Sequence, residues 1–513
     1  MSVPLTYPGV YIQEVPSGSR TITGVATAIA AFVGRASRGP VDEPVPIGSF
    51  TAFERVFGGL WRDSGMSYAV RDFFLNGGSN ALVVRADPAA TTTGINVHGL
   101  HITAYGPGRW SEQLEIEVAA PAAGPDAEAI ARAQGVTAAD LFDLTLRDRF
   151  DASAVVQESF ANVTVADGAR RVDLVLRASR LVRVDHTQAL PASRPDNGIY
   201  TVQSDGTPGK DGSPLQTAAD FGDEATGTGL YALAKAEFTL LCLPPSSPAG
   251  DAPDNLWSAA LAFCQPRRAF LLVDPPALKT TDDIQTWRGG LGLNGPVRRN
   301  AALYFPRISS PDPLRDGAIG DVVPCGAVAG VIARTDAARG VWKAPAGIDA
   351  GLAGVSRPTL PLDDSDIGAL NPLGINCLRA LPVIGPVVWG SRTLSGADVL
   401  ADEFKYVPVR RLALFLEESL SRGTQWVVFE PNDEPLWGQI RADIGAFLQD
   451  LFKRGAFQGR TPREAYFVRC DAETTTQYDI DRGIVNIVVG FAPLKPAEFV
   501  IVRIQQIDPN ATA

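Results

Sequence analysis

Hydrophobic residues follow two patterns along this chain, and each pattern predicts a different kind of element. Some runs are apolar at nearly every position. Such continuous runs are typical of strands buried on both faces, as in a parallel sheet. They predict strands at Ala26–Gly34, Asn80–Ala86, Phe238–Pro244, Ala269–Pro276, Ala301–Ile308 and Leu381–Gly390.

Other segments carry apolar residues three or four positions apart, which predicts amphipathic helices. The last of them begins after a cap candidate, Asp433, with Pro435 in the first turn, and ends at Lys453 and Arg454, which suit a helix C-terminus. Strands that alternate with helices indicate a multi-domain α/β (α+β mixed) fold. The predicted helices are 49–59, 67–78, 255–264, 282–289, 409–422 and 436–453.

The region 102–235 has a different pattern. It predicts short strands at 114–118, 141–147, 153–158 and 181–184, a short helix at 172–178, and a loop rich in Gly, Asp, Thr and Pro at 186–229. A loop of this length marks a linker or a functional surface. We therefore expect a β-rich inserted domain at 102–235. The remaining divisions are an arm at 1–24, the core at 25–101 and 236–400, and a C-terminal domain at 401–513.

Both ends of the chain contain strand-like segments that a single domain has difficulty covering. In the N-terminal arm, prolines and glycine interrupt a short apolar stretch, so it is either the first strand of the home sheet or a strand for a distant edge. Near the C-terminus, Ile484–Phe491 and Phe499–Ile504 predict two strands separated by Pro493 and Pro496. An apolar strand at a free end must be covered by its own domain or by another chain. Strands are also predicted at 425–430 and 465–470.

Charge and composition exclude several classes of protein. The chain has 513 residues, a net charge of −11 and an isoelectric point near 5.0. This acidic balance argues against non-specific nucleic-acid binding. No apolar window is long enough for a membrane span, and the N-terminus does not resemble a secretory signal. The five cysteines are far apart in the sequence, which favours reduced, buried thiols over a disulfide or zinc framework.

Catalytic and metal-binding patterns are not found. The three histidines are His98, His101 and His186, so a Ser-His-Asp triad confined to 236–400 is impossible. His98 and His101 have no carboxylate or cysteine nearby in sequence and are interpreted as loop residues. The glycine-rich segment Gly290–Pro296 lacks the strand-to-helix context of a dinucleotide loop, and Asp363–Asp366 lacks calcium-loop spacing. We expect no catalytic site, metal or cofactor. An α/β hydrolase-type enzyme stays as an alternative that would need one of these histidines beside a partner.

The helix 436–453 has two interpretations. Its wide apolar stripe favours packing against the core, and its polar face could dock another protein; both can hold at once. The polar face consists of Gln439, Arg441, Asp443, Gln449, Asp450 and Lys453.

Several stretches together resemble the tail sheath proteins of contractile phage tails and contractile injection systems. The resemblance covers most of the chain in the expected order and is weakest at 120–140 and 186–215. It is carried by Tyr7–Val15, Thr27–Gly59, Phe73–Arg85, Ile102–Val118, Gly326–Gly347, Leu370–Arg379, Val387–Ser395 and Arg410–Gly459.

The resemblance implies a structural protomer, not an enzyme. Hexameric rings of this chain would stack helically around an inner tube protein, between a baseplate and a terminator or cap protein. The metastable sheath would contract and drive the tube through a target envelope. The core would have a subtilisin-like fold without protease activity, the inserted domain would lie outward, and helix 436–453 would face the tube.

The resemblance also implies that the terminal strands are exchanged between subunits, with the receiving edge in the C-terminal domain. It implies assembly in the bacterial cytoplasm and a place in a phage tail or phage-like particle, with no membrane insertion. A baseplate or other phage structural protein is the nearer alternative. The exchanged residues would be Val10, Tyr11, Ile12, Gln13, Glu14 and Val15 at one end, and Phe499, Val500, Ile501, Val502, Arg503 and Ile504 at the other.

Overall fold

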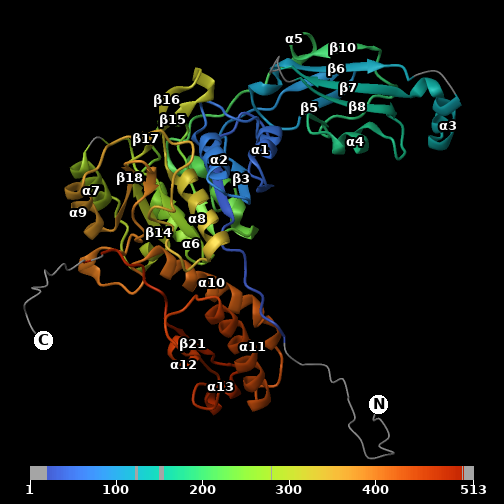
Figure 1. Ribbon diagram of the computed structural model, residues 1–513. Coiled ribbons are helices and arrows are strands. Elements are labelled where there is room, and N and C mark those ends of the chain that lie inside the picture. The colour runs from blue at the N-terminus through green and yellow to red at the C-terminus, as the bar shows by residue number, and fades with distance from the viewer. Residues whose placement is uncertain (1–19, 122–124, 150–154, 279, 500, 502–513) are drawn as a thin grey trace, which may run out of the picture. The chain divides into compact units, whose positions relative to one another are not determined.

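A computed structural model describes residues 20–121, 125–149, 155–278, 280–499 and 501. Contacts divide the chain into two compact units. The larger unit spans 27–338 and 345–407, and the C-terminal unit combines 408–513 with 339–344 and the residues up to Ala26. Figure 1 shows the elements of each unit.

The larger unit is built on an eight-stranded sheet. The strand order is β19-β18-β14-β13-β12-β1-β3-β2, and every neighbouring pair from β18 to β3 is parallel. The inner strands β1, β13 and β14 are buried along their whole length, which confirms the prediction that continuous apolar runs form strands buried on both faces. The strands are β1 (Ala30–Gly34), β2 (Val45–Ile47), β3 (Ala81–Arg85), β12 (Leu240–Cys242), β13 (Phe270–Val273), β14 (Ala301–Phe305), β18 (Ile375–Leu381) and β19 (Gly385–Val388).

The run Leu381–Gly390 is not the single strand that its composition predicts. It holds the end of β18, a three-residue turn at 382–384, and β19, which pairs antiparallel with β18. Leu381 lies opposite Gly385 in this hairpin. Glycine supplies the reversal, because Gly385 adopts a positive φ of 89°.

Helices α1 (Phe50–Phe57), α2 (Gly65–Leu75), α6 (Leu256–Cys264), α7 (Thr281–Gly290), α8 (Cys325–Arg339) and α9 (Asp364–Leu370) accompany the sheet (Figure 1). Local signals set their ends: the Ser49 hydroxyl caps the start of α1, and Gly58 ends it with a φ of 88°. Helix α8 packs closely on α2, because a Cβ at Gly326 would lie 2.0 Å from the Ala69 carbonyl oxygen. A smaller sheet is formed by β15 (Ile308–Asp312), β16 (Ala318–Val322) and β17 (Arg357–Pro358).

The inserted domain has two four-stranded sheets around a separate apolar core. Its limits differ from the expected 102–235. The domain already includes β4 at Gly94, whereas Leu215, Phe221 and Leu233 belong to the apolar core of the large sheet. The sheets contain β4 (Gly94–Val97), β5 (Leu100–Ala104), β6 (Leu114–Ala119), β7 (Phe142–Asp148), β8 (Val156–Val163), β9 (Val182–Val184), β10 (Gly198–Thr201) and β11 (Gly206–Thr207), with helices α3 (Pro125–Gln134), α4 (Val172–Val175) and α5 (Val202–Asp205).

The C-terminal unit is an α+β structure. Helices α10 (Val407–Gly423) and α11 (Glu434–Lys453) contribute most of its apolar core. The strand predicted at 425–430 is wrong: Gln425–Val427 is a 3-10 turn, and Val428 and Phe429 are exposed. The remaining elements are α12 (Pro462–Ala465), β20 (Tyr466–Arg469), α13 (Gln477–Asp481) and β21 (Val488–Phe491).

The segment before the first strand packs against its own C-terminal unit. Ile22 is buried in the apolar core of that unit, and the Val25 N–H donates to the Ser419 hydroxyl at 3.1 Å. The guanidinium of Arg20 lies over the Trp426 ring. Residues 20–24 of the predicted arm therefore contact their own chain.

All five cysteines are buried and unbonded, as expected. None of the helices in the described residues combines the length and apolar character needed to cross a bilayer. Within those same residues, no group of three or more His, Cys, Asp or Glu side chains could hold a metal ion.

Candidate strand-exchange site

Among its described residues, the C-terminal unit contains a sheet of two strands, β20 and β21. They pair antiparallel, with Tyr466 opposite Phe491 and Arg469 opposite Val488. The strand 465–470 predicted from sequence is thus confirmed. Of the home strand expected at 484–491, only Val488–Phe491 forms a strand, and its partner is β20.

One face of this sheet is covered by its own unit. Tyr466, Val468, Val489 and Phe491 pack against the apolar core formed with α10 and α11. The Tyr466 hydroxyl donates to Gln449 Oε1 at 2.8 Å, which attaches β20 to α11. A two-stranded sheet alone is marginal in water, and this packing gives it a fixed support.

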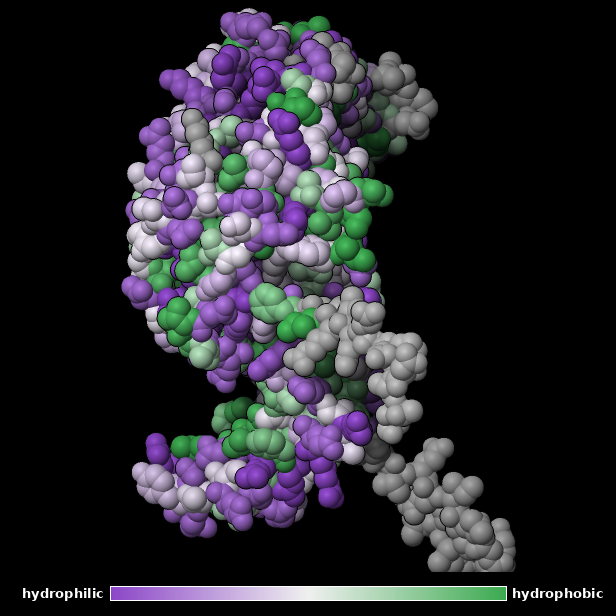
Figure 2. All heavy atoms as spheres, turned by 60° about the vertical axis from the view of Figure 1, so that its left-hand side comes forward, coloured by the Kyte–Doolittle hydropathy of each residue, from purple (hydrophilic) through white to green (hydrophobic). Residues whose placement is uncertain are grey.

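The opposite face of the sheet is partly exposed. The Phe467 side chain retains 48% of its exposure and lies across the neighbouring Gly490, where an added Cβ would be 2.2 Å from the ring. The Arg469 guanidinium lies 5.3 Å from the Phe467 ring centroid. On the face drawn in Figure 2, a group of hydrophobic residues is visible on the C-terminal unit, at the bottom of the picture. Apolar surface of this kind indicates a contact site.

Both outer edges of the sheet are free of other strands within the residues that the structure describes. The Ala492 N–H donates to the Ala465 oxygen at 2.8 Å, so these two residues point their backbone groups toward each other. Along each strand, residues that point toward the partner strand alternate with residues that point away from it. Tyr466 and Val468 therefore direct their backbone N–H and C=O groups outward from β20, and Val489 and Phe491 do so from β21. Each edge can accept one more strand.

The expected exchanged residues lie at the margin of the described chain. Phe499 and Ile501 have no regular structure and are exposed, at 76% and 81%. Residues 10–15, Val500 and 502–504 lie outside the described residues. The exchange of these segments stays a prediction, and the sequence analysis did not single out Phe467 and Gly490 of the two-stranded sheet. An aromatic residue opposite a glycine was the available signal.

The predicted polar face of α11 is not one surface. The prediction that Asp443 belongs to the polar outer face is wrong. Asp443 is only 5% exposed and lies on the side of the helix that carries the buried residues. Burial raises the pKa of its carboxyl, and the Arg20 backbone and charge oppose that shift. Arg441 pairs with Glu434 at 2.5 Å and also donates to the Cys470 oxygen, while Gln449 binds Tyr466. Asp450 and Lys453 are exposed near the end of the helix. Earlier in the helix, the outer side is formed by small residues including Gly438, Ala442 and Ala446.

The histidines provide no catalytic arrangement. His98 Nδ1 lies 2.6 Å from Asp196 Oδ2 at an exposed position in the inserted domain. His101 is on β5 in the same domain. His98 and His186 are exposed, and His101 is half-buried.

Comparison with known proteins identifies the class. A model of the phage tail sheath protein central domain matches residues 220–394, and a model of the phage tail sheath C-terminal domain matches 401–507. Together they span more than half of the chain. The chain belongs to the phage tail sheath protein family.

Individual relatives agree with this assignment. The tail sheath protein of Vibrio phage KVP40 is 27% identical over 49% of this chain and 37% of its own length. That of Enterobacteria phage T4 is 26% identical over 43% of this chain and 33% of its own length. The aligned region thus spans about a third of these curated relatives. Both relatives are tail sheath proteins.

A solved structure agrees over nearly the whole chain. The sheath complex of the PVC extracellular contractile injection system, in its contracted state, has a TM-score of 0.59 at 22% identity, covering 98% of this chain and 99% of that chain. This likeness establishes a shared mixed α/β, multi-sheet fold.

Proposed function

We propose that this chain is the repeating structural protomer of a contractile sheath. Copies assemble in hexameric rings that stack helically around an inner tube, joined to a baseplate at one end and closed by a terminator protein at the other. The sheath contracts from a metastable extended state and drives the tube through a target envelope. The observation that carries this proposal is a two-stranded sheet with two open edges in a member of the sheath family.

The two edges of β20–β21 are the receiving sites for strands from two neighbouring copies. One copy supplies the segment around Val10–Val15, and another supplies the segment from Phe499 to Ile504. Support comes from the exposed Phe499 and Ile501 side chains, which lie only eight to ten residues beyond the end of β21. Backbone ladders tolerate rotation of whole subunits, so exchanged strands keep copies connected while the lattice repacks.

The core has a subtilisin-like arrangement without protease chemistry, because 236–400 contains no histidine. The inserted domain faces outward, and the exposed side of α11, with Asp450 and Lys453, faces the tube. Particles of this kind are assembled in the bacterial cytoplasm as part of a phage tail or phage-like injection system. A baseplate protein is the second candidate, but the two sheath-domain matches favour the sheath.

Truncation of the C-terminus tests strand exchange. Deleting 499–513 removes the donated strand and leaves β20–β21 intact, so we expect a folded monomer that forms no tubes. Deleting only 506–513 is the matched control and should leave polymerisation unchanged. Analytical ultracentrifugation and negative-stain microscopy measure the outcome, with circular dichroism to check folding. Normal tubes from the longer deletion would contradict the exchange of this strand.

A further inference from the structure

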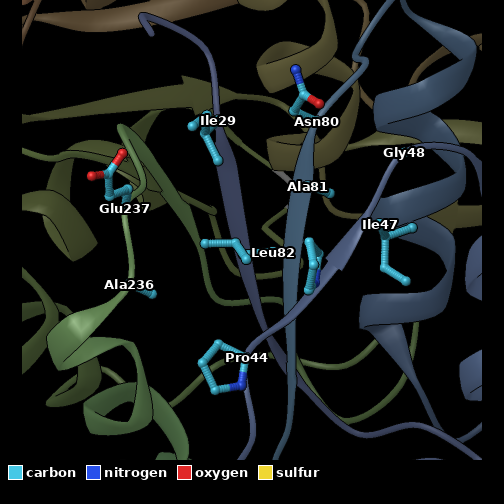
Figure 3. Close-up of a pocket in the computed structure, with 10 residues that line it drawn as sticks. Ile29, Pro44, Ile47, Gly48, Asn80, Ala81, Leu82, Ala236 and Glu237 are labelled. Carbon is cyan, nitrogen blue, oxygen red and sulfur yellow. The ribbon is translucent and has the colours of Figure 1, made fainter. Parts of the chain in front are cut away.

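Two cavities of the larger unit differ in the side chains that line them. The cavity beside β2 has a volume of about 410 Å³ and is lined mainly by apolar residues such as Ile29, Leu82 and Pro44, with Asn80 and Glu237 as polar members (Figure 3). Apolar walls of this kind specify no particular ligand. A cavity of about 240 Å³ between α2 and the β15–β16 hairpin has a different lining, in which charged side chains of both signs meet.

We call this second cavity the charged pocket. Helix α2 and the loop before it contribute two arginines, and the hairpin contributes the other charges. The charged members are Arg62, Arg71, Arg315, Asp312 and Asp321. The volume is below the range of about 300–1,000 Å³ that holds drug-sized ligands, so a molecule bound here must be small.

Two arginines of the pocket have no carboxylate partner in the part of the chain that the structure describes. Arg62 donates to the Leu314 carbonyl oxygen instead, and Arg315 forms no ion pair or side-chain hydrogen bond there. Arg71 differs, since its Nε and Nη2 donate to Asp72 Oδ1 at 3.0 and 2.9 Å. A guanidinium presents five N–H donors in a planar fork that matches a carboxylate. Arg62 and Arg315 therefore have donors available for a carboxylate of a ligand.

The two aspartates of the pocket bind neutral donors. The Tyr68 hydroxyl donates to Asp312 Oδ1 at 2.9 Å, and the Ser309 hydroxyl donates to Asp321 Oδ1 at 2.7 Å. Burial and the interaction with Asp312 raise the pKa of Tyr68, so its hydroxyl keeps the proton that it donates. Among the described residues, the second oxygen of each carboxylate accepts no hydrogen bond, and neither carboxylate forms an ion pair. Each aspartate thus retains an oxygen for a cationic N–H group.

Ser310 adds a hydroxyl for which the fold supplies no partner. This residue lines the charged pocket and is only 3% exposed. Its Oγ forms no hydrogen bond with the residues that the structure describes. A buried polar group without a partner costs free energy, and such groups are rare in folded proteins. A polar ligand in the adjoining cavity supplies the missing bond.

We propose that the charged pocket binds a small zwitterion, with a free α-amino acid as the simplest member of this class. Arg62 and Arg315 bind its carboxylate, and the Ser310 hydroxyl donates to the same group. Asp312 and Asp321 bind its ammonium group. An anion alone would leave the aspartates without a cation, and a cation alone would leave the arginines without an anion. Because all lining residues belong to the larger unit, binding needs no second copy and is independent of the proposed sheath assembly.

Matched ligands test the requirement for both charges. L-Alanine carries a carboxylate and an ammonium group, whereas propionate lacks the ammonium and ethylammonium lacks the carboxylate. Calorimetric titration of the full chain at constant ionic strength should show that alanine binds about tenfold or more tightly than either fragment. Alanine should also raise the thermal midpoint, because it binds the folded chain. Equal binding of propionate would show a site for anions only and overturn the proposal, as would the absence of any alanine effect. Either failure would leave tube formation, and with it the proposed function, untouched.

Substitution of one charge at a time locates the two ends of the ligand. Arg315→Gln should weaken alanine binding about tenfold or more and leave the thermal midpoint without ligand unchanged, since this side chain has no partner to lose in the described residues. Arg177→Gln, at an exposed position in the inserted domain, is the control and should bind alanine normally. Asp321→Asn should weaken alanine binding but strengthen propionate binding, a reversal that a general loss of structure would not produce. Unchanged alanine affinity in both pocket variants would overturn the proposal.

Discussion

The eight-stranded sheet and the two-stranded sheet β20–β21 differ in how their edges are covered. The eight-stranded sheet blocks one edge with a proline in a three-residue strand and covers the other with the segment 347–352. The sheet β20–β21 leaves both edges without a further strand in the part of the chain that the structure describes. Exposed edges invite association. If strands are exchanged as proposed, we therefore expect them to add to β20–β21 and not to the eight-stranded sheet.

The largest contrast is expected from proline at a strand position of each sheet. Leu303→Pro in β14 removes a ladder hydrogen bond from a fully buried strand and should cost more than about 3 kcal/mol, which prevents folding. Val468→Pro leaves the hydrogen bonds between β20 and β21 intact, because the Val468 N–H points outward, and it loses only part of the valine's packing on the core. It should leave a folded chain that cannot accept a strand at that edge. Thermal unfolding measures the first effect and tube formation the second.

Phe467→Pro is the matched control for Val468→Pro, because the Phe467 N–H points into the pair with β21. It should unfold β20–β21 and lower the thermal midpoint, whereas Val468→Pro should lower the midpoint much less. Equal loss of stability in the two variants would contradict the assignment of the outward edge.

A buried carboxyl at the end of β13 makes the larger unit sensitive to pH. Burial raises the pKa of Asp274 to about 7, although its side chain accepts a hydrogen bond from the Cys325 N–H at 2.9 Å. Between the unfolded pKa near 4 and the folded pKa near 7, the folded chain holds a proton that the unfolded chain has lost. Stability should therefore fall by about 1.4 kcal/mol per pH unit across that window as the pH rises.

Asp274→Asn should flatten this dependence. Chemical denaturation of the larger unit at pH 5 and pH 7 measures the effect, with Asp316→Asn at an exposed position as the control. An equally steep loss of stability in Asp274→Asn would refute this role.

Two glycines provide a finer comparison of rigid and adaptable packing. A Cβ added at Gly326 would lie 2.0 Å from a backbone oxygen of α2, and a Cβ added at Gly490 would lie 2.2 Å from the Phe467 ring. The backbone of a buried helix cannot move aside, so Gly326→Ala should cost about 1–3 kcal/mol. The exposed Phe467 ring can rotate away, so Gly490→Ala should cost less than about 1 kcal/mol. Parallel denaturant titrations decide between these outcomes, and equal costs would argue against the distinction.

The smallest effect is expected at Val383, in the turn between β18 and β19. Val383→Gly removes the steric penalty of a positive φ, and should raise the free energy of unfolding by up to about 1 kcal/mol after the greater flexibility of the unfolded chain is counted. The matched substitution Val399→Gly should not raise the free energy of unfolding. A loss of stability in Val383→Gly, seen as a lower denaturation midpoint, would contradict the strain.

Local signals were sufficient for many elements and insufficient for their pairing. The cap at Ser49 and the stop at Gly58 define α1 as predicted. In contrast, Gln425–Val427 is apolar enough for a strand but forms a turn, because tertiary contacts override intrinsic preference. The α11 stripe predicted a core-facing helix correctly, but Asp443 lies on the buried side although polarity alone had assigned it to the surface.

The sequence by itself determined the buried strands, the long helices and the lack of a histidine in 236–400, because each depends on residues close together in the chain. Only the tertiary structure decided that β21 pairs with β20, that Leu215–Phe238 belongs to the core of the large sheet, and that Leu381–Gly390 contains a hairpin turn. These features depend on contacts between distant segments. The free energy of such contacts comes from packing geometry, and no local pattern encodes it.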